Sequence, residues 1–380
     1  MLTNKLKFYG LGIGLRNEIQ KDILSYLEST PKQTLIQWLE IIPENYVNKG
    51  GLPRERFQEV LASGVPLIPH GVNLSIGTAP QNKKRLEFDF YLLAALKELF
   101  QEIKAPWFSD HLSNSRIGSD YLQELIPVPF TKEATEVIAN NIKYLEDYFQ
   151  LPFLFENPSY YTTYGLRELR EQTFINLILE KARCGLLLDL NNVLVNSVNH
   201  RYLPKPFLDD LDLKRVVQIH LGGFKKASAK SPVSRIKLLD SHSEPVSDLV
   251  LDLFSYVIKK TRVKAVLLER DSNFDAEGGF LSLIYELKQI RKIMDSKYDD
   301  SSENLALSAS EPQLTGKAET KELDSDDLKA KPAAALSLEE SSLTDSLLNP
   351  SIKVPQENPI KNNSLANDLD LLDDELSNLG

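Results

Sequence analysis

Residues 185–190 read GLLLDL, a short apolar run with one carboxylate near its end. Near-continuous apolar character over so few residues is typical of a β-strand that is covered on both faces. Seven other segments share this character and are predicted to be strands as well: Tyr9–Leu15, Leu35–Ile42, Val65–His70, Ala105–Asp110, Leu151–Glu156, Val216–Leu221 and Ala265–Glu269. The eight predicted strands are all of the buried kind that parallel sheets use.

Between the strands lie longer stretches whose apolar residues recur at steps of three and four, as on one face of an amphipathic helix. The clearest of these stretches are Phe88–Ile103, Lys132–Phe149, Leu166–Arg183, Val246–Lys260 and Gly278–Met294. Thr131 stands just before Glu133 and Glu136, which predicts that a helix begins at this point.

Alternating strands and helices over residues 1–297 predict an α/β fold, a (β/α)₈ TIM barrel. An open, doubly wound sheet is the alternative. That fold usually carries a glycine-rich phosphate loop after its first strand. The GLGIG motif at Gly10–Gly14 instead lies within the predicted strand, so the barrel is the better interpretation.

The composition of the chain changes near residue 298. Residues 299–380 hold 18 Asp and Glu against 6 Lys and Arg, and they contain no Trp, Phe or Tyr. Such a segment cannot bury enough apolar surface to offset chain entropy, so residues 298–380 are predicted to be a largely disordered acidic tail. Leucines at steps of four and three within residues 365–379 predict a short amphipathic helix that forms on docking to a partner.

Charge and cysteine content exclude several classes of protein. The whole chain carries a net charge of −10 and the tail alone carries −12, so the near-neutral body argues against a nucleic-acid-binding surface. The single cysteine, Cys184, excludes an internal disulfide and is predicted to be a small buried thiol. No apolar run near the N-terminus is long enough for a signal peptide or a membrane helix, which indicates a soluble protein in a reducing, cytoplasmic setting.

Histidines and carboxylates collect where the predicted strands end. In a TIM barrel the C-terminal ends of the strands converge on one mouth, so these side chains are expected to meet. Imidazole and carboxylate together hold borderline divalent metals, and several charges buried without a cation would be strongly unfavourable. Nine residues are therefore predicted to be metal ligands: His70, His111, Glu156, Asp189, Asn192, His220, Asp240, His242 and Glu269.

The number and kind of these candidates point to more than one ion. Nine ligands exceed what a single metal needs, and carboxylates that can bridge suit two or three metals a few ångströms apart. Histidine and carboxylate without thiolate favour iron, manganese or zinc. His200 differs from the others, because it falls in a long loop expected after the strand at 185–190. There it would line the substrate opening, hydrogen-bond to a ligand or be purely structural.

The segments that carry these residues resemble the multinuclear non-haem iron-dependent oxidases, a bacterial family that includes the methanobactin biosynthetic oxidase. In order they are GLGIGLR, IPHGVNLSIG, SDHLS, FENPSYY, CGLLLDLNNVLVNSVNH, IHLGGF, LDSHSEPV and LLERD. The resemblance implies a barrel with two or three iron ions (Fe²⁺/Fe³⁺) that oxidises a ribosomally synthesised peptide, often at cysteine, with O₂. It also implies a precursor peptide as substrate and a partner protein that presents the leader of that peptide.

The order of the candidate ligands is also similar to that of endonuclease IV, a three-zinc barrel of the xylose isomerase-like superfamily. In that family a histidine would be expected at Asn192. The comparison implies that His70 and His111 hold one metal, that Glu156 bridges, and that Asp189, His220 and Glu269 hold a second. It implies that Asp240 and His242, with Asn192, hold a third. Two departures from the oxidase pattern, Asn114 and Phe224, lie near the mouth and concern the substrate more than the metals.

The leading hypothesis is therefore an iron-dependent oxidase or oxygenase that acts on a peptide. Besides the ligands and His200, we predict four catalytic-site residues that would orient the ligands through hydrogen bonds: Asp110, Asn157, Asn191 and Asp271. Two alternatives stay open. One is a zinc- or manganese-dependent phosphodiesterase, or a sugar isomerase or epimerase, in the same barrel. The other is a non-enzymatic metal-binding protein whose acidic tail recruits a partner.

Overall fold

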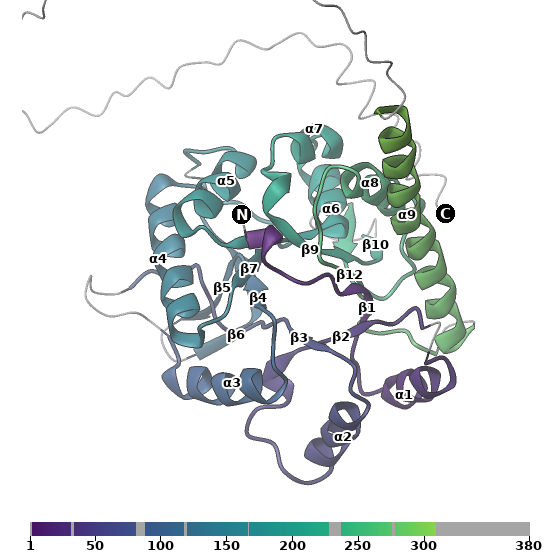
Figure 1. The fold of residues 1–380 in the computed structure, drawn as a ribbon. Coiled ribbons are helices and arrows are strands. Elements are labelled where there is room, and N and C mark those ends of the chain that lie inside the picture. Colours follow the sequence, from purple (N-terminus) through teal and green to yellow (C-terminus); the bar gives the residue numbers. More distant parts are fainter. Residues whose placement is uncertain are drawn as a thin grey trace, which may run out of the picture.

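A computed structural model describes residues 2–31, 34–80, 88–117, 120–165, 167–227, 237–275 and 278–308. Eight parallel strands form a barrel with helices around it (Figure 1). The strands are β1 (Gly10–Gly14), β2 (Trp38–Ile41), β3 (Leu67–Pro69), β4 (Phe108–His111), β7 (Phe153–Glu156), β8 (Gly185–Asp189), β9 (Val216–Leu221) and β12 (Ala265–Leu268). Their order is β3-β2-β1-β12-β9-β8-β7-β4, and a bridge between His70 and Ser109 joins the two ends. The TIM-barrel prediction is confirmed, and the doubly wound alternative is wrong.

The helices lie where the apolar periodicity places them, with some added. They are α1 (Gln20–Ser29), α2 (Gly51–Ala62), α3 (Phe90–Glu102), α4 (Lys132–Phe149), α5 (Glu171–Ala182), α6 (Leu190–His200), α7 (Pro204–Asp209), α8 (Asp248–Ile258) and α9 (Gly279–Ser308). Thr131 caps α4, because its hydroxyl oxygen accepts a hydrogen bond from the Ala134 N–H at 3.1 Å. The loop predicted around His200 is wrong, since Asp189 caps α6 directly after β8 and His200 is the last residue of that helix.

Helix α9 runs across the boundary predicted at residue 297 and ends at Ser308. The rest of the predicted tail, including the amphipathic helix at 365–379, lies outside the described residues. No helix in the described part of the chain is long and apolar enough to cross a membrane.

The interior of the barrel is filled with apolar side chains at its N-terminal end. This cluster consists of Trp38, Ile68, Trp107, Leu154, Leu187, Val217, Ala265 and Leu267. Leu2, Leu6 and Tyr9 of the N-terminal segment pack against it from below. Because that end is closed, only the opposite mouth of the barrel can admit a ligand.

Glycines in β1 make room for this packing. A Cβ atom at Gly12 would lie 2.5 Å from the indole ring of Trp38, closer than side-chain packing allows. The GLGIG motif at Gly10–Gly14 is thus a strand, as predicted, and not a phosphate loop; its Gly12 accommodates a neighbouring ring.

An irregularity in β9 directs His220 into the barrel. The pairing of β8 with β9 skips one residue at Val217. Val217 packs in the interior cluster, yet Gln218 also faces the interior, where its side-chain oxygen accepts a hydrogen bond from the Trp107 indole N–H at 2.9 Å. A bulge of this kind shifts the alternation of the strand by one residue, so that His220 points inward as well.

Two small hairpins rise above the mouth of the barrel. One pairs β5 (Ser113–Ile117) with β6 (Asp120–Pro127) directly after β4. The other pairs β10 (Phe224–Lys226) with β11 (Leu238–Asp240) after β9. Both hairpins bring side chains to the mouth that the barrel strands alone do not supply.

Candidate metal centre

The histidines and carboxylates predicted from the sequence meet at the C-terminal end of the barrel. Among the described residues, three overlapping groups place their ligand atoms within 4.8 Å of one another: His70, Glu156 and His220; Glu156, Asp189, His220 and Glu269; and His242, Glu269 and Asp271. Glu156 and His220 belong to the first two groups, and Glu269 belongs to the last two. Shared carboxylates of this kind are the arrangement that holds adjacent metal ions.

Glu156 lies at the middle of the cluster. Its Oε2 atom is 2.9 Å from His70 Nε2, 3.6 Å from His111 Nε2 and 3.9 Å from His220 Nδ1. The side chain is buried at the end of β7, between β4 and β8. One carboxylate oxygen therefore faces three imidazoles that come from three different strand ends.

Two of these imidazoles are held by partners outside the cluster. His70 Nδ1 lies 2.9 Å from the hydroxyl oxygen of Ser109, and His220 Nε2 lies 2.9 Å from Glu40 Oε2. In each ring the other nitrogen faces Glu156 or Glu269. Metal-binding histidines characteristically use one nitrogen for the ion and the other for such a hydrogen bond.

Asp189 serves both the fold and the cluster. Its Oδ1 accepts a hydrogen bond from the Asn192 N–H at 2.5 Å and caps α6, while its Oδ2 lies 4.0 Å from His242 Nε2. Asn157 fixes the backbone of Asp189 by donating to its carbonyl and accepting from its N–H. The Asn192 amide donates to Glu156 Oε1 at 3.3 Å, which places it beside the cluster.

His242 reaches the cluster from a strained turn after β11. Its φ of 44° is one that residues other than glycine rarely adopt. A Cβ atom at Gly222 would lie 2.6 Å from the His242 ring, so the two glycines after β9 let this turn pack closely. His242 Nε2 is 2.8 Å from Asp240 Oδ1, and its Nδ1 is 3.4 Å from Glu269 Oε1.

Many polar atoms of the cluster make no well-directed hydrogen bond in the described structure, and where they approach another group, as His70 Nε2 approaches Glu156 Oε2, that group is also a candidate ligand. They include Glu156 Oε2, Asp189 Oδ2, Glu269 Oε2, Asn192 Oδ1, His70 Nε2, His111 Nδ1, His220 Nδ1 and His242 Nε2. Buried polar atoms are nearly always hydrogen-bonded, so a concentration of unpaired donor atoms calls for another partner. Nitrogen and oxygen atoms facing one another around a shared centre fit bound cations, and the donor set suits iron, manganese or zinc.

Burial and mutual attraction shift the pKa values of these groups strongly. Burial and the nearby Glu156 raise the pKa of Asp189. Burial also raises the pKa of Glu156, but His111 and His70 oppose it more strongly and bring that pKa to about 2. Burial lowers the pKa of His111, and Glu156 with Asp110 raises it to about 9. These shifts show buried charges that depend on one another, a situation that a bound cation relieves.

The remaining predicted residues surround the cluster or lie behind it. Asp110 Oδ2 accepts from the Leu74 N–H at 2.9 Å, and Asn191 donates to Asp240 Oδ1 at 2.8 Å. Asp271 pairs with Arg16 and also lies 3.4 Å from His242 Nδ1.

His200 is not in the cluster. Its Nε2 lies 2.8 Å from the backbone oxygen of Tyr160, and its ring stacks on the Tyr160 ring at 4.4 Å between centroids. Tyr160 itself lines the cavity over the cluster, so His200 supports the wall of that cavity from behind.

A cavity of about 610 Å³ opens above the cluster. His70, His111, His242 and Glu269 form its floor, and Ser159 to Thr162 form part of its wall. A cavity of this volume accommodates a ligand the size of a small molecule or of a few residues of a peptide. The cavity therefore leads directly to the residues of the cluster.

A family model described as RiPP precursor modification enzyme MbnB/TglH/ChrH matches residues 10–295, the whole barrel. The chain belongs to this family. RiPPs are ribosomally synthesised and post-translationally modified peptides, so the resemblance inferred from the strand-end motifs is confirmed at the level of the family.

Relatives of this MbnB/TglH/ChrH family member span nearly their whole length in the comparison. A UPF0276 protein of Haemophilus influenzae is 34% identical over 309 residues, which cover 76% of this chain and 95% of the relative. A UPF0276 protein of Neisseria meningitidis is 36% identical over 266 residues, which cover 69% and 88%. Among solved structures, endonuclease IV from Thermus thermophilus is similar at 16% identity and a TM-score of 0.43, covering 76% of this chain and 99% of that one.

Sequence reasoning missed a buried carboxylate of the MbnB/TglH/ChrH barrel that touches a predicted ligand. Glu40 is 1% exposed and lies within the apolar segment Leu35–Ile42, where it is the lone charged residue. A charge inside a strand buried on both faces needs a partner, and this signal was present in the sequence. The partner, His220, lies three strands away in the sheet and could not be read from the chain.

Glu171 provides a test of electrostatics in this family member away from the cluster. The buried carboxylate accepts a hydrogen bond from the Tyr160 hydroxyl at 2.6 Å, and burial raises its pKa from 4.5 to about 7. The folded state thus holds this proton to higher pH than the unfolded chain, so stability is lost as the pH rises from 4.5 through 7. Glu171→Gln keeps the acceptor and removes the ionisation.

We expect the stability advantage of Glu171→Gln over the wild type to grow by about 3 kcal/mol across that pH window. Urea unfolding of both metal-free proteins at pH values below and above the window measures the difference. An advantage that is equal at both ends would contradict the prediction.

Proposed function

We propose that this chain is a multinuclear iron-dependent oxidase or oxygenase that modifies a ribosomally synthesised precursor peptide at cysteine, with O₂ as co-substrate. The observation that carries the proposal is the concentration of unpaired nitrogen and oxygen donor atoms at the barrel mouth. Membership in a family of RiPP precursor modification enzymes supplies the class of substrate.

The geometry of the cluster supports two or three ions. His70 would hold one with Glu156, and Asp189, His220 and Glu269 would hold a second that shares Glu156, because the free Nδ1 of His220 can bind only one ion. His242 with Glu269 and Asp271 would hold a third, with Asp240 next to His242. His111 and Asn192 both lie next to Glu156 and would add their ligand atoms to these sites. This division keeps Glu156 as the bridge but assigns Glu269 to two positions.

The residues of the chain would prepare the site for this chemistry. Iron bound there would supply electrons to dioxygen and positive charge to anchor a substrate thiolate. Ser109 and Glu40 fix the rings of His70 and His220, so that their free nitrogens face the centre. Tyr160 and the rest of the cavity wall would hold the peptide over the floor and keep bulk water away.

The substrate class also implies a second protein. A precursor peptide has a leader in addition to the residues that react, and we include in the proposal a partner protein that binds the leader. The cavity of about 610 Å³ takes only a few residues, so the leader would be recognised outside it.

Protein purified without oxygen tests the proposal. We expect elemental analysis to find two or three iron ions per chain, and Mössbauer spectroscopy to show them coupled to one another. Addition of a cysteine-containing precursor peptide should start oxygen consumption. A colourless zinc protein that hydrolyses or isomerises a substrate without oxygen would overturn the redox assignment.

A further inference from the structure

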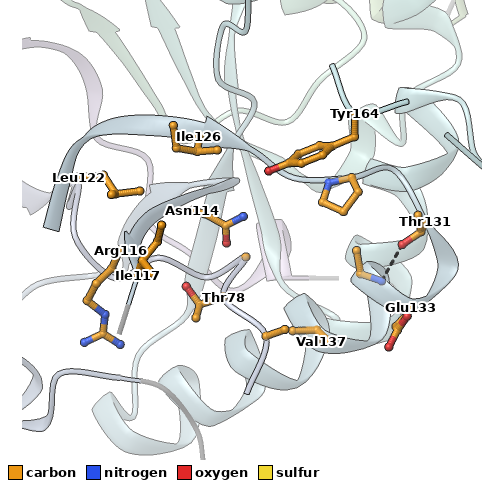
Figure 2. A pocket seen from close by; sticks show the side chains of 14 residues that line it. Thr78, Asn114, Arg116, Ile117, Leu122, Ile126, Thr131, Glu133, Val137 and Tyr164 are labelled. Carbon is orange, nitrogen blue, oxygen red and sulfur yellow. Dashed lines mark hydrogen bonds between the residues drawn. The ribbon is translucent and has the colours of Figure 1, made fainter. Parts of the chain in front are cut away.

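A second cavity, of about 540 Å³, lies beside the first, between the β5–β6 hairpin and the start of α4. Figure 2 shows Leu122 and Ile126 of the hairpin on one side of it and Val137 of α4 opposite. We name this cavity the hairpin groove. The residues that line it include Asn114, Arg116, Ile117, Ile126, Val137 and Tyr164. None of the metal-ligand candidates lines it.

The hairpin groove adjoins the mouth of the barrel. Ile126 lines both cavities, and the hairpin forms the wall between them. Ser115 of β5 lines the mouth, whereas Asn114, Arg116 and Ile117 line the groove. A chain that leaves the mouth over Ile126 therefore enters the groove directly.

Three large apolar side chains of the groove are exposed. Ile117 is 69% exposed, Tyr164 46% and Ile126 37%. An apolar surface that gathers large exposed side chains around a hollow is characteristic of a binding site. Arg116, by contrast, is 6% exposed, and its buried Nε has no hydrogen-bond partner in the described structure. Its N–H could donate to a carbonyl oxygen of a bound peptide.

We propose that the hairpin groove binds an apolar side chain of the precursor peptide, a fixed number of residues from the residue that reacts over the metal cluster. The inference rests on the proposed function for its peptide substrate. It follows from the size of the mouth, which holds only a few residues, and from the continuity of the two cavities at Ile126. The groove would thus set which residue of the peptide reaches the metals.

Selection of peptides by the iron-loaded, full-length protein tests the proposal. The probe is a phage-displayed pool in which a single cysteine is flanked by random residues on both sides, kept without oxygen. We expect an enriched large apolar residue at one fixed distance from the cysteine. Ile117→Glu places a charge in the groove and should weaken binding of the selected peptide at least about tenfold, since the charge opposes burial of an apolar side chain.

Leu281→Glu is the matched control, because Leu281 is 75% exposed on α9 and does not line the groove. It should leave binding unchanged, and both variants should keep the metal content of the wild type. Equal binding by the Ile117→Glu protein, or enrichment of cysteine without an apolar position, would overturn the groove proposal while leaving the proposed function intact. Peptides that bind through the groove but start no oxygen consumption when oxygen is admitted would support the groove proposal and overturn the proposed function.

A photo-crosslinking residue at position 117 identifies the occupant directly. In the full-length protein we expect it to react with the selected peptide at its apolar position. Crosslinks to residues 309–380 of the same chain, or to a second copy, that persist when the peptide is in excess would instead assign the groove to that segment and overturn the proposal.

Discussion

Glu156→Gln is expected to remove at least one metal ion per chain and to lower the rate of peptide modification by about 10³-fold. The carboxylate faces His70, His111 and His220 through one oxygen, and it belongs to two of the three ligand groups. Glutamine has almost the same shape but carries no charge and cannot bridge two ions. Loss of charge stabilisation worth about 4 kcal/mol corresponds to that fall in rate.

The measurement is the metal content of protein purified without oxygen, together with the rate of oxygen consumption. Glu171→Gln is the matched control, since it also replaces a buried glutamate by its amide but lies outside the cluster. That variant should keep its metals. A Glu156→Gln protein with full metal content and full activity would show that Glu156 is not a ligand.

The fold could be predicted from local sequence because each of its units carries its own signal. The run at 185–190 is apolar except for the carboxylate near its end, which is typical of a strand covered on both faces, and its residues Gly185–Asp189 form β8. Thr131 marks the start of α4 because its side chain caps the helix, accepting a hydrogen bond from the Ala134 N–H three residues away. Signals of this range depend on neighbours in the chain and need no knowledge of the tertiary structure.

The sequence could predict which side chains gather at the mouth of the barrel but not the contacts between them. The barrel rule brings strand ends together, and that rule alone placed His70, Glu156 and His220 at one mouth. It could not show the bulge at Val217 that turns His220 inward, because a bulge depends on the register between two strands.

The prediction for His200 was wrong for a related reason. The sequence predicts a loop after β8, but Asp189 caps a helix there, and the helix carries His200 behind the cavity wall. An aspartate at the end of a strand can predict either the start of a helix or a metal ligand, and the prediction used only the second possibility. In the structure Asp189 does both, with one oxygen for each.

Glu40 lies one layer below the metal cluster and is expected to control it through His220. His220 Nε2 and Gln218 Nε2 lie 2.9 Å and 2.6 Å from the same Glu40 oxygen. A carboxylate only accepts hydrogen bonds, so the proton between Glu40 and His220 belongs to the imidazole. The other nitrogen, Nδ1, then has its lone pair free toward Glu269 and Glu156, as metal binding requires.

Glu40→Leu removes the acceptor and should weaken metal binding by about 10- to 100-fold, the usual effect of losing such a partner. Glu40→Gln retains an acceptor oxygen without the charge, so its effect should be smaller. Competition with a chelator measures the affinity, and the Mössbauer spectrum should change for the ion next to His220 while the others keep their signature. A loss of all ions together would instead indicate general unfolding.

Trp107→Phe separates orientation from packing in this network. The Trp107 indole donates to Gln218 and does not touch His220, so its replacement disturbs the same buried layer but leaves the bond between Glu40 and His220 in place. We expect Trp107→Phe to lower stability with little change in metal affinity. If it weakens metal binding as much as Glu40→Leu does, the role assigned to Glu40 is wrong, because the affinity then depends on packing beneath the cluster. If it does not, the hydrogen bond that His220 donates to Glu40 is what turns Nδ1 of His220 toward the metals.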